Sequence, residues 1–137
     1  MKKYSFGGYR VEINMTDTEK WYRNYPGWGC GCGHCRNFLK LASQRKLPES
    51  VLAVLGELPV LPEKATYVGE LYTDGEGVHY QFSYRLAGSI VMLPEDSDES
   101  TQMRCCHESY PYGAPDFPTP NFDLEFFAVL PWVLEEG

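Results

Sequence analysis

The sequence predicts an α+β fold, with an antiparallel sheet of about five strands and two or three helices packed on one face. Segments in which apolar and polar residues alternate outnumber segments with a helical apolar stripe. The helical segments lie together, between the first strand and the remaining strands. A hairpin signal joins two of the strands, and hairpins produce antiparallel pairs.

The chain is expected to begin with a strand and a short helix. Residues 9–15 alternate between apolar and polar side chains, which predicts a half-buried strand. Residues 16–25 predict a helix, with Thr16 or Thr18 as its N-cap and acidic residues in its first turn. Pro26 is expected to end this helix.

Two further helices are predicted before the chain changes to strands. Phe38, Leu41 and Ala42 form an apolar stripe at helical spacing, directly after a cysteine-rich segment. Pro48 is expected to open the next helix, and Pro59 to stop it.

The second half of the chain is predicted to be mostly strand. Residues 65–73 and 78–86 flank the sequence Asp-Gly-Glu-Gly, a strong hairpin signal. In the second of these strands the expected apolar face consists of Val78, Tyr80, Phe82, Tyr84 and Leu86, and the polar face of His79, Gln81, Ser83 and Arg85. Further strands are expected at residues 89–93, 101–109 and 121–130, and a solvated loop at 94–100.

Length and charge narrow the class of protein. A chain of 137 residues with 43% hydrophobic residues predicts a single domain spanning 1–137. Its formal net charge of −7 argues against nucleic acid and anionic membranes as partners. The first ten residues contain two lysines but no apolar segment, so no signal peptide is expected. We therefore predict a cytoplasmic protein, in which cysteines stay reduced.

The segment Gly-Trp-Gly-Cys-Gly-Cys-Gly-His-Cys, residues 27–35, is the main candidate site. Cys30, Cys32 and Cys35 have the close spacing by which a tight turn directs several sulfur atoms to one point. Structural zinc takes four such ligands in a tetrahedron. The fourth ligand has to come from elsewhere, and the sequence offers several candidates: His34, His79, Cys105, Cys106 and His107.

A redox function is the first alternative. Residues 32–35 spell Cys-Gly-His-Cys, the active-site tetrapeptide of protein disulfide isomerases. A helix is expected to follow, and a helix N-terminus lowers the pKa of a cysteine placed there. In this interpretation Cys32 is the nucleophile and Cys35 the resolving thiol. The many hairpin strands after the motif differ from the alternating strands and helices of a thioredoxin-like domain.

A second alternative is a plain partner-binding protein with inert cysteines, since cysteine is often simply a small buried hydrophobic residue. The contacts would then come from the polar face of the hairpin strand, with His79, Gln81 and Arg85, or from the proline-rich loop 110–120. No carboxylate pair or serine motif stands out, so no catalytic residue is assigned and a non-enzymatic role is favoured.

The motif Trp-x-Cys-x-Cys-x-x-Cys-Arg-Asn-Phe, residues 28–38, resembles an uncharacterised family of small bacterial hypothetical proteins. The resemblance extends along nearly the whole chain, to the Pro-Trp-Val-Leu sequence at 131–134. No function is known for the family. Cys30, Cys32, Cys35 and His79 match its positions, so the resemblance implies a zinc site made of three thiolates and one imidazole. The favoured interpretation is a binding domain with a structural zinc site and an unidentified protein or small-molecule partner.

Overall fold

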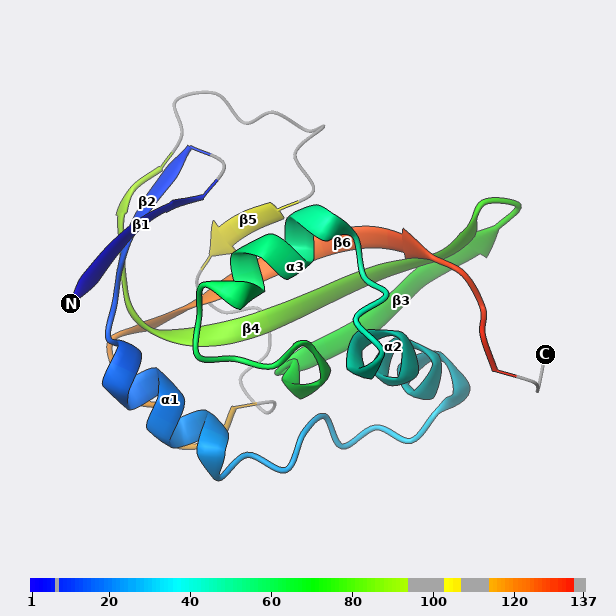
Figure 1. Cartoon of the computed structure of the whole chain (residues 1–137), viewed down its shortest axis with the longest axis horizontal. Helices are drawn as coiled ribbons and strands as arrows, with labels where there is room; N and C mark the ends of the chain where they lie inside the picture. Colours follow the sequence, from blue (N-terminus) through cyan, green and yellow to red (C-terminus); the bar gives the residue numbers. More distant parts are fainter. Residues whose placement is uncertain (7, 94–102, 107–113, 135–137) are drawn as a thin grey trace.

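The computed structural model describes residues 1–6, 8–93, 103–106 and 114–134, and these form a sheet with helices packed on it (Figure 1). The six strands pair antiparallel in the order β1-β2-β4-β6-β5, with β3 also paired to β4. The strands are β1 (Lys2–Phe6), β2 (Tyr9–Ile13), β3 (Tyr67–Asp74), β4 (Gly77–Met92), β5 (Met103–Cys106) and β6 (Asn121–Leu130). The helices are α1 (Met15–Arg23), α2 (Gly33–Ser43), α3 (Glu49–Gly56) and the short 3-10 helix η1 (Pro62–Lys64). The predicted α+β class is confirmed.

The long strand β4 organises the sheet. It pairs with β6 along one edge, and along the other edge first with β3 and then, near its end, with β2. The predicted hairpin is confirmed, since Asp74 at the end of β3 pairs with Gly77 at the start of β4. The expected strands 78–86 and 89–93 are one continuous strand. Gly88 has a φ of +144° at this position, and its backbone lies so close to the Glu12 carbonyl that a Cβ would collide with it.

The core lies between the sheet and the helices α2 and α3. The predicted apolar face of β4 is confirmed, because all five of its side chains are at most 2% exposed. The facing residues of β6 are buried beside them: Phe122, Leu124, Phe126, Ala128 and Leu130. From α2, the ring of Phe38 lies 4.7 Å from that of Phe82 and 5.7 Å from that of Tyr80. This packing fixes α2, and with it the cysteine turn, against the sheet.

Helix α1 begins at a different cap from the one expected. Asn14 is the N-cap, and its Oδ1 accepts a 3.0 Å hydrogen bond from the backbone N–H of Asp17. The prediction of Thr16 or Thr18 was wrong because the hydroxyl of Thr18 has other partners. It donates to the Asn14 carbonyl and accepts from the backbone N–H of Ala87 in β4. Helix α1 is thereby joined to the edge of β4.

Strand β1 was not expected from the sequence. This strand pairs with β2 over five residues and is rich in polar side chains, so it lacks a clear apolar alternation. Of the strand expected at 101–109, residues 103–106 form β5, and the rest lies outside the described residues. The loop expected at 94–100 also lies outside them. Among the helices of the described residues, none has the length and apolar character needed to cross a membrane.

Candidate metal centre

The cysteines lie where an irregular segment meets the beginning of α2. Gly27, with a φ of +110°, lets the chain turn after α1. Cys32 is the N-cap residue of α2 and has extended backbone angles, and its carbonyl accepts the 2.9 Å hydrogen bond of Arg36 that starts the helix. Cys35 therefore lies in the first turn. Cys35 is buried, whereas Cys30 and Cys32 are exposed.

The three sulfur atoms come together. The Sγ atoms of Cys30, Cys32 and Cys35 all lie within 4.8 Å of one another. Zinc–sulfur bonds of about 2.3 Å in a tetrahedron place the sulfur atoms about 3.8 Å apart, so the cluster closes around an ion after small side-chain movements. The donor set therefore fits zinc or another ion that prefers thiolates.

The pKa values of the two cysteines in the Cys-Gly-His-Cys sequence are shifted in opposite directions. The backbone N–H of Cys35 bonds to the sulfur of Cys32 and, together with the thiols of Cys30 and Cys35, lowers the pKa of Cys32. Burial raises the pKa of Cys35 to about 12, with the neighbouring thiol of Cys32 adding to the shift. Of these two cysteines, Cys32 is thus the one that ionises at the lower pH.

Trp28 supplies a hydrogen-bond donor to the buried thiol. Its indole Nε1 lies 3.3 Å from the Sγ of Cys35, and this bond acts to lower the pKa that burial raises. The ring of Trp28 lies edge-on to Tyr67 of β3, at a centroid distance of 5.7 Å. The tryptophan therefore links the cysteine turn to the sheet and orients one of the three sulfur atoms.

A buried hydrogen-bond network fastens α2 beside the cysteines. Asn37 is fully buried, and its Nδ2 donates to the Pro131 carbonyl at 3.0 Å, while its Oδ1 accepts from the backbone N–H of Val133 at 2.7 Å. The hydroxyl of Tyr80 in β4 donates to the carbonyl of His34 at 2.6 Å. The role of Asn37 could not be predicted from the sequence, because its partners Pro131 and Val133 lie more than 90 residues away along the chain.

His79 does not join the three thiols. It lies in a separate group with Asp74 and Glu76 near the β3–β4 turn, and its Nε2 is 3.0 Å from the Oδ2 of Asp74. Its ring also stacks on that of Tyr72, at a centroid distance of 4.0 Å. The structure thus brings together three of the four residues that the sequence placed in one site. His79 is held by neighbours on its own hairpin.

The other candidate ligands have different neighbours. The Nε2 of His34 lies 2.6 Å from a carboxylate oxygen of Glu70. Cys105 is buried opposite Leu124 in the β5–β6 pair, and Cys106 lies 3.8 Å from the Oε2 of Glu125. His107 lies outside the described residues. Within the described part of the chain, the group of metal-ligating side chains at the turn consists of the three thiols alone.

The polar face of β4 is partly buried and carries ion pairs. Arg85 donates to both carboxylate oxygens of Asp123 in β6, at 3.0 Å each, and both side chains are at most 10% exposed. Arg104 of β5 pairs with the fully buried Glu125. Ser83 is buried as well. Arg85 is one of the residues considered for contacts with a partner. Its side chain instead joins β4 to β6 within the sheet.

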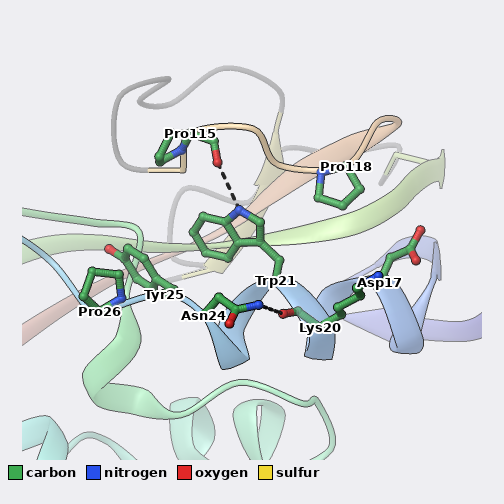
Figure 2. Close-up of a pocket in the computed structure, with 8 residues that line it drawn as sticks. All are labelled: Asp17, Lys20, Trp21, Asn24, Tyr25, Pro26, Pro115 and Pro118. Carbon is green, nitrogen blue, oxygen red and sulfur yellow. Dashed lines mark hydrogen bonds between the residues drawn. The ribbon is translucent and has the colours of Figure 1, made fainter.

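A cavity lies apart from the cysteines, between α1 and the segment 115–118 (Figure 2). Its volume is about 430 Å³, which suits a small ligand. Figure 2 shows the indole of Trp21 below Pro115. Its Nε1 donates to the Pro115 carbonyl at 3.1 Å. The lining residues are Asp17, Lys20, Trp21, Asn24, Tyr25, Pro26, Pro115 and Pro118. Sequence reasoning could not find this cavity, since its two walls are about 90 residues apart.

Comparisons with protein-family models, with curated proteins and with solved structures found no match. The resemblance to a bacterial family stays a prediction. Function has to be argued from the geometry of the chain itself.

Proposed function

We propose that the protein is a small non-enzymatic binding domain in which Cys30, Cys32 and Cys35 hold one zinc ion. The observation that carries this proposal is the approach of the three Sγ atoms to within 4.8 Å of one another. An ion held there would stabilise the fold, since it would tie the irregular segment after α1 to the first turn of α2. Because the pKa of Cys32 is lowered, this thiol is prepared to act as a thiolate ligand.

The burial pattern supports a structural role for the ion. Cys35 is 5% exposed and lies in the same core cluster as Phe38, whose ring packs on β4. Cys30 lies in a segment without helix or strand. A metal bridge between these two cysteines would order the segment. Because the ion would bind the folded chain and not the unfolded chain, it would raise the free energy of unfolding.

The test is zinc content and thermal unfolding of the untagged chain, purified without chelator. We expect close to one zinc per chain, and we expect Cys32→Ser to lose the metal and lower the Tm. Cys106→Ser is the matched control, because Cys106 lies on β5 beside Glu125 and should leave zinc content unchanged. A Cys32→Ser variant with an unchanged Tm would exclude the structural role.

A thiol–disulfide oxidoreductase is the second candidate. The lowered pKa of Cys32 and the raised pKa of Cys35 favour it. In such enzymes an exposed thiolate at a helix N-terminus attacks a substrate disulfide, forms a mixed disulfide and releases the other substrate thiol. The resolving thiol then attacks the mixed disulfide, which releases the second substrate thiol and leaves an internal disulfide.

Insulin reduction with dithiothreitol separates the two candidates. An oxidoreductase would accelerate it, and Cys35→Ser would trap mixed disulfides on Cys32. A zinc-binding domain would do neither.

The proposal of a zinc-binding domain includes a location in the cytoplasm and a protein or small-molecule partner. All five cysteines are free, which agrees with a reducing compartment.

A further inference from the structure

We propose that the three-thiol cluster is a binding site for a trivalent thiophilic ion, with arsenic(III) as its representative. The ion would be held by Cys30, Cys32 and Cys35 at a coordination number of three. This inference rests on the proposed function only in requiring that the three cysteines form one site. It differs from the proposed function in the ion that the three thiols bind, arsenic(III) in place of zinc, and in the coordination number of that ion.

The donor set of the cluster suits an ion that forms three bonds. Three sulfur atoms lie within 4.8 Å of one another, and in the part of the chain that the structure describes no fourth ligand joins them. Zinc prefers four ligands and would take one from outside the three thiols, whereas arsenic(III) forms three bonds and carries a lone pair in the remaining direction, so the three thiols complete its coordination. Soft thiolates also favour a soft ion over oxygen-preferring metals.

The second argument is charge. Three thiolates around a divalent ion leave one negative charge, but three thiolates around a trivalent ion form a neutral group. Neutrality matters here because Cys35 is buried and the chain already has a formal net charge of −7. A negative charge beside a buried sulfur atom is costly, so the neutral complex avoids a cost that the charged complex bears at Cys35.

The third argument is access. Cys30 and Cys32 are exposed, so a dissolved ion can reach two of the sulfur atoms before it engages the third. Arsenous acid then exchanges its three hydroxyl groups for three thiols. Three As–O and three S–H bonds break, three As–S bonds form, and three water molecules leave. Arsenic stays in oxidation state three, so the exchange needs no oxidant or reductant.

The experiment uses the full-length chain, reduced with a phosphine so that no small thiol competes for the ion. Sodium arsenite and zinc chloride are titrated in parallel, with native mass spectrometry and arsenic X-ray absorption as the readouts. We expect one arsenic per chain, a mass gain of one arsenic less three hydrogens, and three sulfur neighbours. Cys30→Ser, a change at an exposed position, should weaken arsenic binding by at least about tenfold. Cys106→Ser should leave it unchanged.

Two results would overturn the inference and leave the metal site standing. One is zinc binding without arsenic binding, and the other is arsenic bound through two sulfur atoms with an oxygen retained. Failure of both ions to bind would overturn the proposed function and this inference together. A loss of arsenic binding in Cys106→Ser equal to that in Cys30→Ser would place the ion at another site and would also refute the inference.

Discussion

Cys32 and Cys35 lie three positions apart and have opposite environments. Cys32 is exposed, and its sulfur accepts a hydrogen bond from the backbone N–H of Cys35, whereas Cys35 is buried in the core. Sequence spacing predicted that the thiols would meet, since a short turn can bring such close neighbours together. The helix expected after Cys32 also predicted a lowered pKa for this thiol. The raised pKa of Cys35 could not be predicted, because the burial that causes it depends on how α2 packs against β4.

This asymmetry predicts the pH dependence of alkylation in the metal-free protein. The pKa of Cys32 is lowered, so iodoacetamide should modify it with a midpoint below that of an ordinary thiol. The pKa of Cys35 is raised to about 12, so Cys35 should stay protected through neutral pH. Peptide mass mapping after timed alkylation between pH 6 and 10 measures the midpoint of Cys32 and shows whether Cys35 stays unmodified across the same range. Equal midpoints for the two cysteines would contradict the geometry.

The same asymmetry affects stability with a definite sign. Lowering the pKa of Cys32 in the folded state stabilises the fold above the unfolded pKa, and this stabilisation is lost as the pH falls through the folded pKa. Raising the pKa of Cys35 works in the other direction. The folded state prefers its thiol, so stability falls as the pH rises from the unfolded pKa towards about 12.

Trp28 provides a prediction about the buried sulfur. Trp28→Phe keeps an aromatic ring beside Tyr67 but removes the Nε1–H that donates to Cys35. Donors to metal ligands commonly affect metal affinity by about tenfold or more, so we expect zinc affinity to fall by about tenfold. A competitive chelator titration measures the change. In the control, Trp21→Phe removes an indole N–H that donates to Pro115, and zinc affinity should not change.

At the scale of elements, local patterns predicted most of the fold and failed where a partner decides the structure. Side-chain alternation identified the apolar face of β4, and the Asp-Gly-Glu-Gly turn sequence identified the hairpin, because both features depend on local residues. The missed strand β1 is strand because β2 offers it hydrogen bonds, and no pattern of its own residues records that. The break expected between residues 86 and 89 lies within one strand, which curves towards β2 (Figure 1), and Glu12 approaches Gly88 there.

Gly88 tests this close approach of Glu12 to β4. Gly88→Ala places a Cβ against the Glu12 carbonyl, at a residue whose φ of +144° already disfavours a side chain. We expect a loss of more than about 1 kcal/mol in the free energy of unfolding, measured by urea denaturation. Gly56→Ala is the control, since a Cβ there meets nothing within 4 Å and should cost little. Equal stability of the two variants would show that the approach of Glu12 does not restrict residue 88.

At the scale of the whole molecule, the sheet is held on one face by apolar packing and on the other by ion pairs. The pair of Arg85 and Asp123 joins β4 to β6 with two hydrogen bonds of 3.0 Å. The polar face of β4 was predicted from the sequence, but the burial of Ser83 and Arg85 on it was not. Removal of one partner leaves a buried charge, which is the costly case for such pairs.

Asp123→Asn should therefore lower the free energy of unfolding by about 3 kcal/mol. The matched control is Glu19→Gln, which breaks the exposed pair of Glu19 and Arg23 on α1. Such exposed pairs contribute less than about 1 kcal/mol. Chemical denaturation of both variants measures the difference. Similar losses in the two variants would mean that the pair on β4 does not behave as a buried pair.

The central claim is that Cys30, Cys32 and Cys35 together hold one metal ion. The most direct test is the metal content of the untagged protein, measured by mass spectrometry together with a count of reactive thiols. We predict close to one metal ion per chain, with these three thiols protected until a chelator removes the ion. Protein without metal that also binds none on addition, with the exposed thiols of Cys30 and Cys32 freely reactive, would contradict the claim.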